Sequence, residues 1–168
     1  MTNITQSELR ALFDYDAETG VFTRRVDMAL HKFKAGSPAG LGKHGSHAQI
    51  KIRGRSYMTH RLAWLYVYGE WPNGWLDHVN RNPSDNRIAN LRVATPSQNK
   101  MNCDLRADNS SGHKGVTWVS SRRRWVSHCT VNKVRKQLGY FKDKQAAIDA
   151  YETYAKAHHG DFYCSGGE

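Results

Sequence analysis

A central segment of the chain concentrates side chains that could bind a cation and activate water. Asp77 and His78 stand side by side, and two asparagines, Asn90 and Asn99, follow further along. The oxygens of an aspartate and an asparagine suit Mg²⁺ or Mn²⁺ better than Zn²⁺, and such a cation keeps several bound waters. A neighbouring histidine, with an ordinary pKa of about 6.5, can take a proton from one of these waters. The residue types therefore favour metal-assisted hydrolysis.

Local patterns predict the elements that carry the first part of this segment. Residues 76–79 are predicted to form a strand, residues 80–86 a turn-rich loop, and residues 91–93 the returning strand. Adjacent side chains on a strand point to opposite faces. We therefore expect Asp77 and His78 to diverge from one another.

A short helix is predicted to follow the returning strand. Thr95 is placed to cap it, Pro96 suits the first helical position, and Gln98 completes a capping box. Asn99 then projects from the first turns of this helix. The segment thus predicts the order strand, loop, strand and helix.

The same segment resembles the HNH nuclease family, in particular phage and intron-encoded homing endonucleases of a His-Asn-Asn variant. The resemblance covers roughly residues 19–102, and its motifs are Asp77-His78, Asp85-Asn86-Arg87-Ile88, Asn90-Leu91-Arg92 and Ser97-Gln98-Asn99. It implies a ββα-metal domain in which His78 is the general base and Asp77 the first metal ligand. Asn90 would bond across the loop and hold the histidine in place. Asn99 stands where the family often has His, and is expected to bind the metal as well.

The activity implied by this resemblance is metal-dependent hydrolysis of DNA to 5′-phosphate and 3′-hydroxyl ends. His78 would deprotonate the attacking water, and one Mg²⁺ or Mn²⁺ held by Asp77 and Asn99 would stabilise the phosphate in the transition state. Arg87 or Arg92 could clamp a phosphate, although either could equally be a solvated surface charge.

No zinc site is expected. The three cysteines lie far apart without CxxC spacing, which also argues against a disulfide scaffold. His44, His47 and His60 are interpreted as structural or solvent-exposed residues rather than as extra ligands.

The residues before the central segment are predicted to be scaffold. Their expected elements are a helix capped by Thr5, a strand at 21–23, a loop at 35–45, strands at 50–53 and 56–58, and a helix from Thr59 to Gly69. A polar stretch at 105–112 is the predicted linker.

The carboxyl-terminal part is predicted to be a small basic sheet followed by a helix. Strands are expected at 115–119, 124–131 and 137–140, and a helix at 144–159 that begins at Asp143 and ends at Gly160. Residues 113–142 include eight Lys or Arg and no acidic residue. A sheet with such one-sided charge favours contact with phosphates.

This part resembles the DNA-binding domain of plant ethylene-response factors (APETALA/ERF). The shared motifs are Lys114-Gly115-Val116, Arg124-Trp125, Leu138-Gly139-Tyr140-Phe141 and the helix at 146–151. The resemblance implies a three-stranded antiparallel sheet that lies in the major groove and packs on one helix. The residues expected to contact DNA are Lys114, Thr117, Arg122, Arg123, Arg124, Trp125, His128, Thr130 and Arg135. Trp118 and Trp125 could instead belong to the core of the sheet.

Composition fits this two-part interpretation. The 168 residues include 25 Lys or Arg against 15 Asp or Glu, a net charge of +10 that favours a polyanionic partner. The chain has no apolar run near the roughly 20 residues of a membrane span, and its beginning lacks a signal-peptide pattern. We therefore expect an α+β protein that has double-stranded DNA as its partner and does not associate with membranes. Its expected location is the cytoplasm, which is that of a bacterial host if the protein is phage-encoded.

The predicted domains are an HNH nuclease at 1–104, with its scaffold, and an ERF-like DNA-binding domain at 113–168. One such centre would nick one strand, so cutting both needs a second copy or a second event, which leaves self-association open. Two alternatives remain at this point: a DNA-binding regulator with a vestigial nuclease centre, and a phage nuclease of relaxed specificity.

Overall fold

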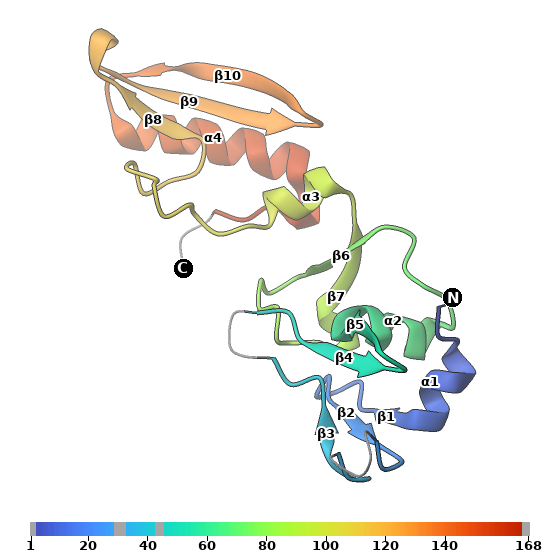
Figure 1. Ribbon diagram of the computed structural model, residues 1–168. Coiled ribbons are helices and arrows are strands. Elements are labelled where there is room, and N and C mark those ends of the chain that lie inside the picture. The colour runs from blue at the N-terminus through green and yellow to red at the C-terminus, as the bar shows by residue number, and fades with distance from the viewer. Residues whose placement is uncertain (1–2, 29–32, 43–45, 166–168) are drawn as a thin grey trace. The chain divides into compact units, whose positions relative to one another are not determined.

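The computed structural model describes residues 3–28, 33–42 and 46–165, and it contains both helices and strands (Figure 1). The chain divides into two compact units, Met1–Ala94 and Thr95–Glu168. This division falls before the predicted linker at 105–112, so the short helix that carries Asn99 counts with the second unit. Within the described ranges, no helix has both the length and the apolar character needed to cross a bilayer.

The first unit combines two helices with short antiparallel strands. Its strands form a sheet of order β1-β2-β3 and the two hairpins β4-β5 and β6-β7. In chain order, the elements are α1 (Gln6–Leu12), β1 (Phe13–Tyr15), β2 (Phe22–Arg24), β3 (Pro38–Ala39), β4 (Gln49–Ile52), β5 (Arg55–Met58), α2 (Thr59–Tyr68), β6 (Trp75–His78), the 3-10 helix η1 (Ile88–Asn90) and β7 (Leu91–Ala94).

The predicted capping box of α1 and the predicted start and end of α2 are confirmed. Thr5 accepts a hydrogen bond from the backbone N–H of Glu8, whose carboxylate in turn accepts from the N–H of Thr5 at 3.0 Å. This reciprocal pairing is a capping box, and it satisfies two N–H groups that the helix itself leaves unpaired. Helix α2 begins at Thr59 and has Gly69 as its C-cap.

The prediction of a continuous loop at 35–45 is wrong in one place. Pro38 and Ala39 form β3, which pairs with β2 so that Ala39 lies opposite Phe22. Proline is tolerated because β3 is an edge strand, where its missing N–H costs no ladder hydrogen bond. Ala39 is buried and contributes to the core, while residues 43–45 lie outside the described part.

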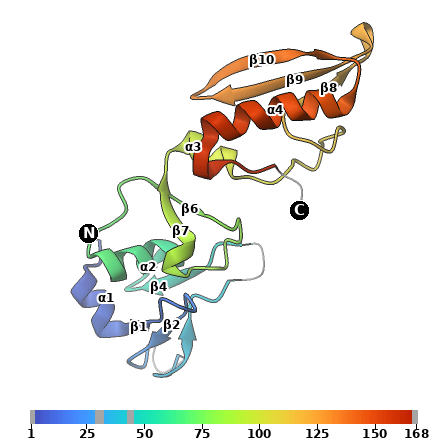
Figure 2. The same cartoon turned by 180° about the vertical axis from the view of Figure 1, so that it is seen from behind.

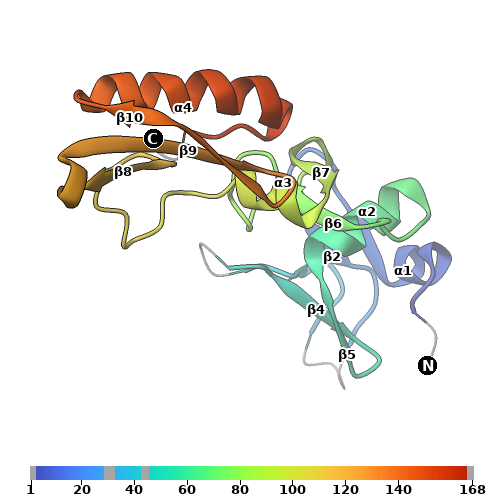
Figure 3. The same cartoon turned by 90° about the horizontal axis from the view of Figure 1, so that it is seen from above.

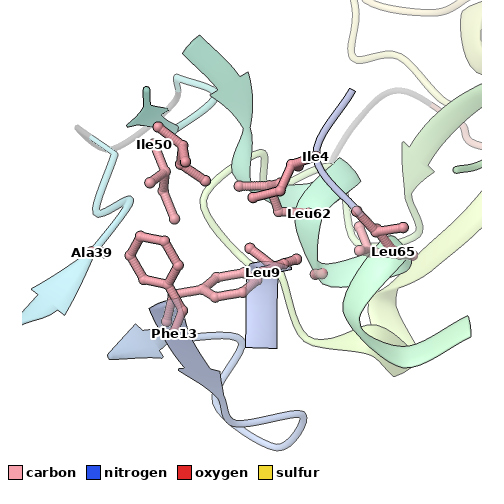
Figure 4. Packing of buried hydrophobic residues seen from close by; sticks show 11 residues of the cluster. Ile4, Leu9, Phe13, Ala39, Ile50, Leu62 and Leu65 are labelled. Atoms are coloured by element: carbon pink, nitrogen blue, oxygen red, sulfur yellow. The ribbon is translucent and has the colours of Figure 1, made fainter. Parts of the chain in front are cut away.

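One hydrophobic core holds the first unit together and reaches the central segment. Leu9 of α1, Phe13 of β1 and Leu62 of α2 are fully buried, and Ile50 of β4 joins them (Figure 4). Leu91, the first residue of β7, belongs to the same cluster. Burying each large apolar side chain contributes about 1.5–3 kcal/mol. The core therefore anchors β7 at Leu91, the residue between Asn90 and Arg92.

The second unit is a three-stranded antiparallel sheet with a long helix beside it. The strand order is β10-β9-β8, and α4 runs along one side of the sheet (Figures 2 and 3). Its elements are α3 (Pro96–Met101), β8 (Val116–Val119), the 3-10 helix η2 (Ser120–Arg122), β9 (Arg124–Val131), β10 (Val134–Phe141), α4 (Lys144–His159) and the 3-10 helix η3 (Gly160–Phe162).

Helix α4 matches its prediction at both ends and along its apolar stripe. The Asp143 carboxylate accepts from the N–H of Ala146 at 2.9 Å, and the helix ends before Gly160. Ala147 and Tyr151 pack with Val116 of β8 in the core of this unit. The core joins the helix to one side of the sheet and leaves the other side outside it.

The predicted linker contains no helix or strand, but its backbone is held in place. The side-chain oxygen of Asn109 accepts hydrogen bonds from Ser111 and from the N–H of Gly112, at 3.0 and 2.7 Å. Its amide nitrogen donates to the carbonyl of His113 at 3.1 Å. Ser111 is buried. Residues 109–113 are therefore a structured loop rather than a free tether.

Gly20 makes a close approach that allows a direct test of how the N-terminal hairpin supports the central loop. It has φ +74°, and a Cβ there would lie 2.5 Å from the backbone N of Arg87 and 2.6 Å from the backbone C of Asn86. Gly54 has a similar φ, +82°, but a Cβ there would meet no atom within 4 Å.

We expect Gly20→Ala to lower the free energy of unfolding more than Gly54→Ala. Both substitutions incur the left-handed backbone cost of about 1–2 kcal/mol, and only the first also displaces the loop. Chemical denaturation of the two variants measures the difference. Equal losses would contradict a supporting contact at Gly20.

Candidate active site

Asp77 and His78 occupy the end of β6, in a hairpin whose register is set by β7. Asp77 lies opposite Arg92, and His78 lies opposite Leu91. Because adjacent side chains alternate along a strand, Asp77 and His78 point to opposite faces of the hairpin. Each residue is only 5% exposed. A buried carboxylate and a buried imidazole require partners, and the structure supplies them from different elements.

Asn90 closes the loop between the two strands. Its side-chain oxygen accepts from the N–H of Asn80 at 2.9 Å, and its amide nitrogen donates to the side-chain oxygen of Asn80 and to the carbonyl of Asp85. The backbone carbonyl of Asn90 also accepts from the N–H of Val79. These bonds tie both ends of the loop together directly after His78. The role of Asn90 in catalysis stays a prediction.

Asn86 connects this loop to the imidazole of His78. Its side-chain oxygen lies 3.3 Å from Nε2 of His78, and both residues are buried. The carbonyl of Asn86 accepts from the hydroxyl of Tyr15, on β1, at 2.7 Å. With Gly20 packed against the same backbone, the N-terminal hairpin fixes the residue that orients His78. Local sequence patterns do not predict the contact of Tyr15 with Asn86, because it joins residues 71 positions apart.

The surroundings of His78 favour the neutral imidazole. Burial lowers the pKa of His78 below its ordinary value, while the hydrogen bond with Asn86 acts in the opposite direction. A neutral ring that donates from Nε2 to Asn86 keeps Nδ1 as its proton acceptor. The side chain is therefore in the form that a general base needs at neutral pH.

Two further histidines pack against His78. The ring centroids of His47 and His60 lie 5.6 and 5.3 Å from that of His78, and 5.1 Å from each other. Burial, together with the neighbouring His78 and His47, lowers the pKa of His60 to about 3. His60 is thus a buried neutral ring that packs behind His78. His44 lies outside the described residues.

Both arginines proposed as phosphate clamps bind carboxylates. Arg92 donates from Nε and Nη2 to Oδ2 of Asp77, at 2.8 and 2.7 Å. Arg87 donates from Nε and Nη2 to Asp85, and this pairing lowers the pKa of Asp85 to about 2. The clamp role of either arginine stays a prediction, since a phosphate would have to share or replace these partners.

Asp77 and Asn99 carry oxygen atoms of the type that a hard cation prefers. In the described ranges, no group of three His, Cys, Asp or Glu side chains could hold a metal ion. Asp77 offers carboxylate oxygen, and the guanidinium of Arg92 already stands against it as a cationic partner. Asn99 lies on α3, whose capping box at Thr95 and Gln98 is confirmed. The joint ligation by Asp77 and Asn99 stays a prediction.

The C-terminal sheet presents most of the predicted DNA-contacting residues on one side. Thr117 lies opposite Val126, and Arg135 lies opposite Thr130. Directly opposite residues share a face, and alternate residues share it along a strand. The residues on the side away from α4, which we call the outer face, are Thr117, Arg124, His128, Thr130 and Arg135. Arg122 and Arg123 lie in the connection from β8 to β9, as predicted.

Trp125 and Lys114 do not lie on the outer face, and their predicted contact with DNA stays a prediction. Trp125 lies opposite Trp118 and Phe141 and packs with the core beside α4, because odd-numbered residues of β9 face the helix. The Trp118 and Trp125 rings are in edge contact at 5.2 Å between centroids. Lys114 donates from Nζ to the carbonyls of Met101 and Cys164, at 3.1 and 3.2 Å. It ties backbone segments together and does not belong to the outer face.

Comparison with known proteins supports the nuclease interpretation of the central segment. Residues 57–101 match the model of a family described as HNH endonuclease. The match supports an HNH endonuclease domain here. It contains His60, Asp77, His78, Asn90 and Asn99.

Two curated relatives come from viruses. Protein 3.8 of Escherichia phage T7 is 36% identical over 67 residues, which are 39% of this chain and 55% of the relative. The Uncharacterized HNH endonuclease L560 of Acanthamoeba polyphaga mimivirus is 27% identical over 123 residues, 73% of this chain and 63% of the relative. The chain thus spans less than two thirds of the length of either relative. No solved structure matches the chain.

The buried His60 predicts a loss of stability in acid. Its pKa is about 3 in the folded state and about 6.5 in an unfolded chain. Below pH 6.5 the unfolded chain therefore takes up a proton that the folded protein refuses, so the free energy of unfolding falls as the pH drops from about 6.5 towards 3.

Between pH 7 and pH 5, the free energy of unfolding should fall in both the wild type and His60→Gln. We expect the fall to be about 2 kcal/mol smaller in His60→Gln. Urea denaturation at the two pH values measures it. The control is His158→Gln, which replaces an exposed histidine of α4. If His60→Gln and the control lose equal stability in acid, His60 is not buried in its neutral form.

Proposed function

We propose that this protein is a metal-dependent DNA endonuclease of the HNH type. In this proposal it hydrolyses a phosphodiester to 5′-phosphate and 3′-hydroxyl ends, and Mg²⁺ or Mn²⁺ is the cofactor. The observation that carries the proposal is the buried, neutral His78 next to Asp77, held by Asn86 at the end of β6. The family match over residues 57–101 supports it.

Each residue of the proposed site has a distinct task. His78 takes a proton from the water that attacks phosphorus, at the nitrogen that does not bond to Asn86. Asn90 holds the loop so that Asn86 stays against the imidazole. Asp77 and Asn99 supply the oxygen ligands. When bound, the cation supplies positive charge for the phosphate and the departing 3′-oxygen.

The second part of the proposal is that the outer face of the C-terminal sheet binds DNA, as in ethylene-response factors. Three observations support it: the one-sided charge of residues 113–142, the position of Arg124 and Arg135 on this face, and the absence of α4 from it. The nuclease site contacts mainly backbone phosphate and carries little sequence information, so a separate reader would supply the specificity. A site-specific, homing-type enzyme is the form of activity we propose.

The nuclease activity can be tested on plasmid DNA incubated with Mg²⁺, or with EDTA, followed by sequencing of the ends. We expect nicks or breaks only with Mg²⁺, with 5′-phosphate ends and at discrete positions. His78→Ala should reduce the rate by about 10²–10⁴-fold, because it removes the general base, while DNA binding persists.

The matched control is His158→Ala, which removes a histidine of α4 distant in sequence from the motif and should leave cleavage unchanged. Binding without scission by the wild type would instead favour a regulator with a vestigial centre. A smear of products would indicate relaxed specificity.

Two adjacent residues of β10 test the outer face, because their side chains leave opposite sides of the sheet. Arg135 is on the outer face, whereas the ammonium of Lys136 lies 4.7 Å from the Tyr154 ring of α4. We expect Arg135→Gln to weaken DNA binding and to reduce the slope of log affinity against log salt by about 1, as loss of one phosphate contact requires.

Lys136→Gln removes the same charge from the helix side and should leave that slope unchanged. Both are measured by fluorescence anisotropy over a salt series. Equal effects of the two variants would mean that net charge, and not the outer face, determines the binding.

A further inference from the structure

The pairing of β6 with β7 places Asp77 directly opposite Arg92, and the two side chains form an ion pair. The two residues lie directly opposite each other on β6 and β7, so their side chains leave the same face. Two guanidinium nitrogens of Arg92 converge on one carboxylate oxygen, Oδ2 of Asp77, at 2.8 and 2.7 Å. The Asp77 side chain is 6% exposed and that of Arg92 is 18% exposed. This pair is far less exposed than the other arginine–carboxylate pair of the hairpin, Arg87–Asp85.

A buried carboxylate needs a positively charged partner. Two cations, the guanidinium of Arg92 and a divalent metal ion, would compete for the same carboxylate oxygen of Asp77. Leaving a buried charge without its partner is strongly unfavourable. Arg92 satisfies this need without a metal ion, since guanidinium is always protonated. A divalent cation that binds Oδ2 of Asp77 therefore meets the positive charge of Arg92 at close range. Repulsion between the two must weaken cation binding unless the guanidinium finds another anion.

DNA provides such an anion. The planar fork of arginine binds phosphate oxygens as well as it binds a carboxylate, and a bound strand brings phosphates to a site that cuts them. The long side chain of Arg92 can turn from Asp77 to a phosphate while its backbone stays fixed in β7. Such an exchange would remove the repulsion and leave Asp77 to the cation.

We propose that Arg92 is a counter-ion that couples the binding of DNA to the binding of the divalent cation at Asp77. This inference rests on the proposed function, because it takes Asp77 as a cation ligand. Without DNA, Arg92 neutralises Asp77 and keeps the cation affinity low. With DNA, its guanidinium binds phosphate, and the cation affinity rises. Linkage requires the cation to strengthen DNA binding by the same factor.

The test measures Mn²⁺ affinity of the full-length protein by electron paramagnetic resonance, with and without a short mixed-sequence DNA duplex at low salt. All proteins carry His78→Ala, so that the DNA stays intact. With Arg92 present, we expect the duplex to strengthen Mn²⁺ binding at least about tenfold, an ordinary size for coupling between two sites. With Arg92→Gln, Mn²⁺ should bind about tenfold more tightly without DNA, and the effect of DNA should largely disappear.

Two further variants separate charge from structure. Arg92→Lys keeps the positive charge, so its Mn²⁺ affinity without DNA should stay as low as with arginine, and this variant keeps the test open if Arg92→Gln does not fold. Arg53→Gln removes an arginine from an exposed pair with Glu8 and should change neither quantity. Thermal unfolding confirms that each variant is folded.

The outcomes distinguish this inference from the proposed function. Weaker Mn²⁺ binding in Arg92→Gln would mean that Arg92 only orients Asp77, and it would overturn the inference. An equal effect of DNA in Arg92→Gln and Arg53→Gln would also overturn it, while Mg²⁺-dependent cleavage by the wild type would leave the proposed function intact. If Mn²⁺ binds none of the proteins, with or without DNA, both proposals fail.

Discussion

The hydrogen bonds of Asn90 across the loop between β6 and β7 are the interaction on which the surroundings of His78 depend. They join the N–H and side chain of Asn80 to the carbonyl of Asp85, so the loop that follows His78 is closed on itself. A closed loop fixes Asn86, and Asn86 fixes the imidazole. Buried polar groups of this kind are costly when unpaired, so the loss of one of these hydrogen bonds destabilises the loop.

The hydrophobic core and this polar network meet at one strand. Leu91 is buried in the core of the first unit, and its neighbours Asn90 and Arg92 hold the loop and Asp77. Packing therefore sets the position of the strand, and the strand sets the positions of the polar partners. The N-terminal hairpin completes the support, because Tyr15 and Gly20 contact the backbone on either side of the bond between Asn86 and Arg87.

In the second unit, the alternation of side chains along each strand gives the sheet two sides with different surroundings. The apolar and aromatic residues that face α4, Trp125 among them, form the core. The outer face keeps Arg124, His128 and Arg135 away from that core. Neighbouring residues such as Arg135 and Lys136 thus have opposite environments despite their equal charge.

The sequence by itself determined those features whose cause lies within a few residues. Capping boxes at Thr5 and Thr95, the end of α2 before Gly69 and the start of α4 after Asp143 all depend on hydrogen bonds between near neighbours, so each could be predicted. The motif from Asp77 to Asn99 was recognisable from its residue types and spacing, through its resemblance to the HNH family.

Tertiary structure alone decided which residues surround that motif. The bond of Tyr15 to Asn86 joins residues 71 positions apart, and the packing of His60 behind His78 joins a helix to a strand. Likewise, alternation placed Trp125 and His128 on different sides of β9, but only the packing of α4 determined which side is covered. Local patterns carry no information about such contacts, because they arise when separate elements bury a common surface.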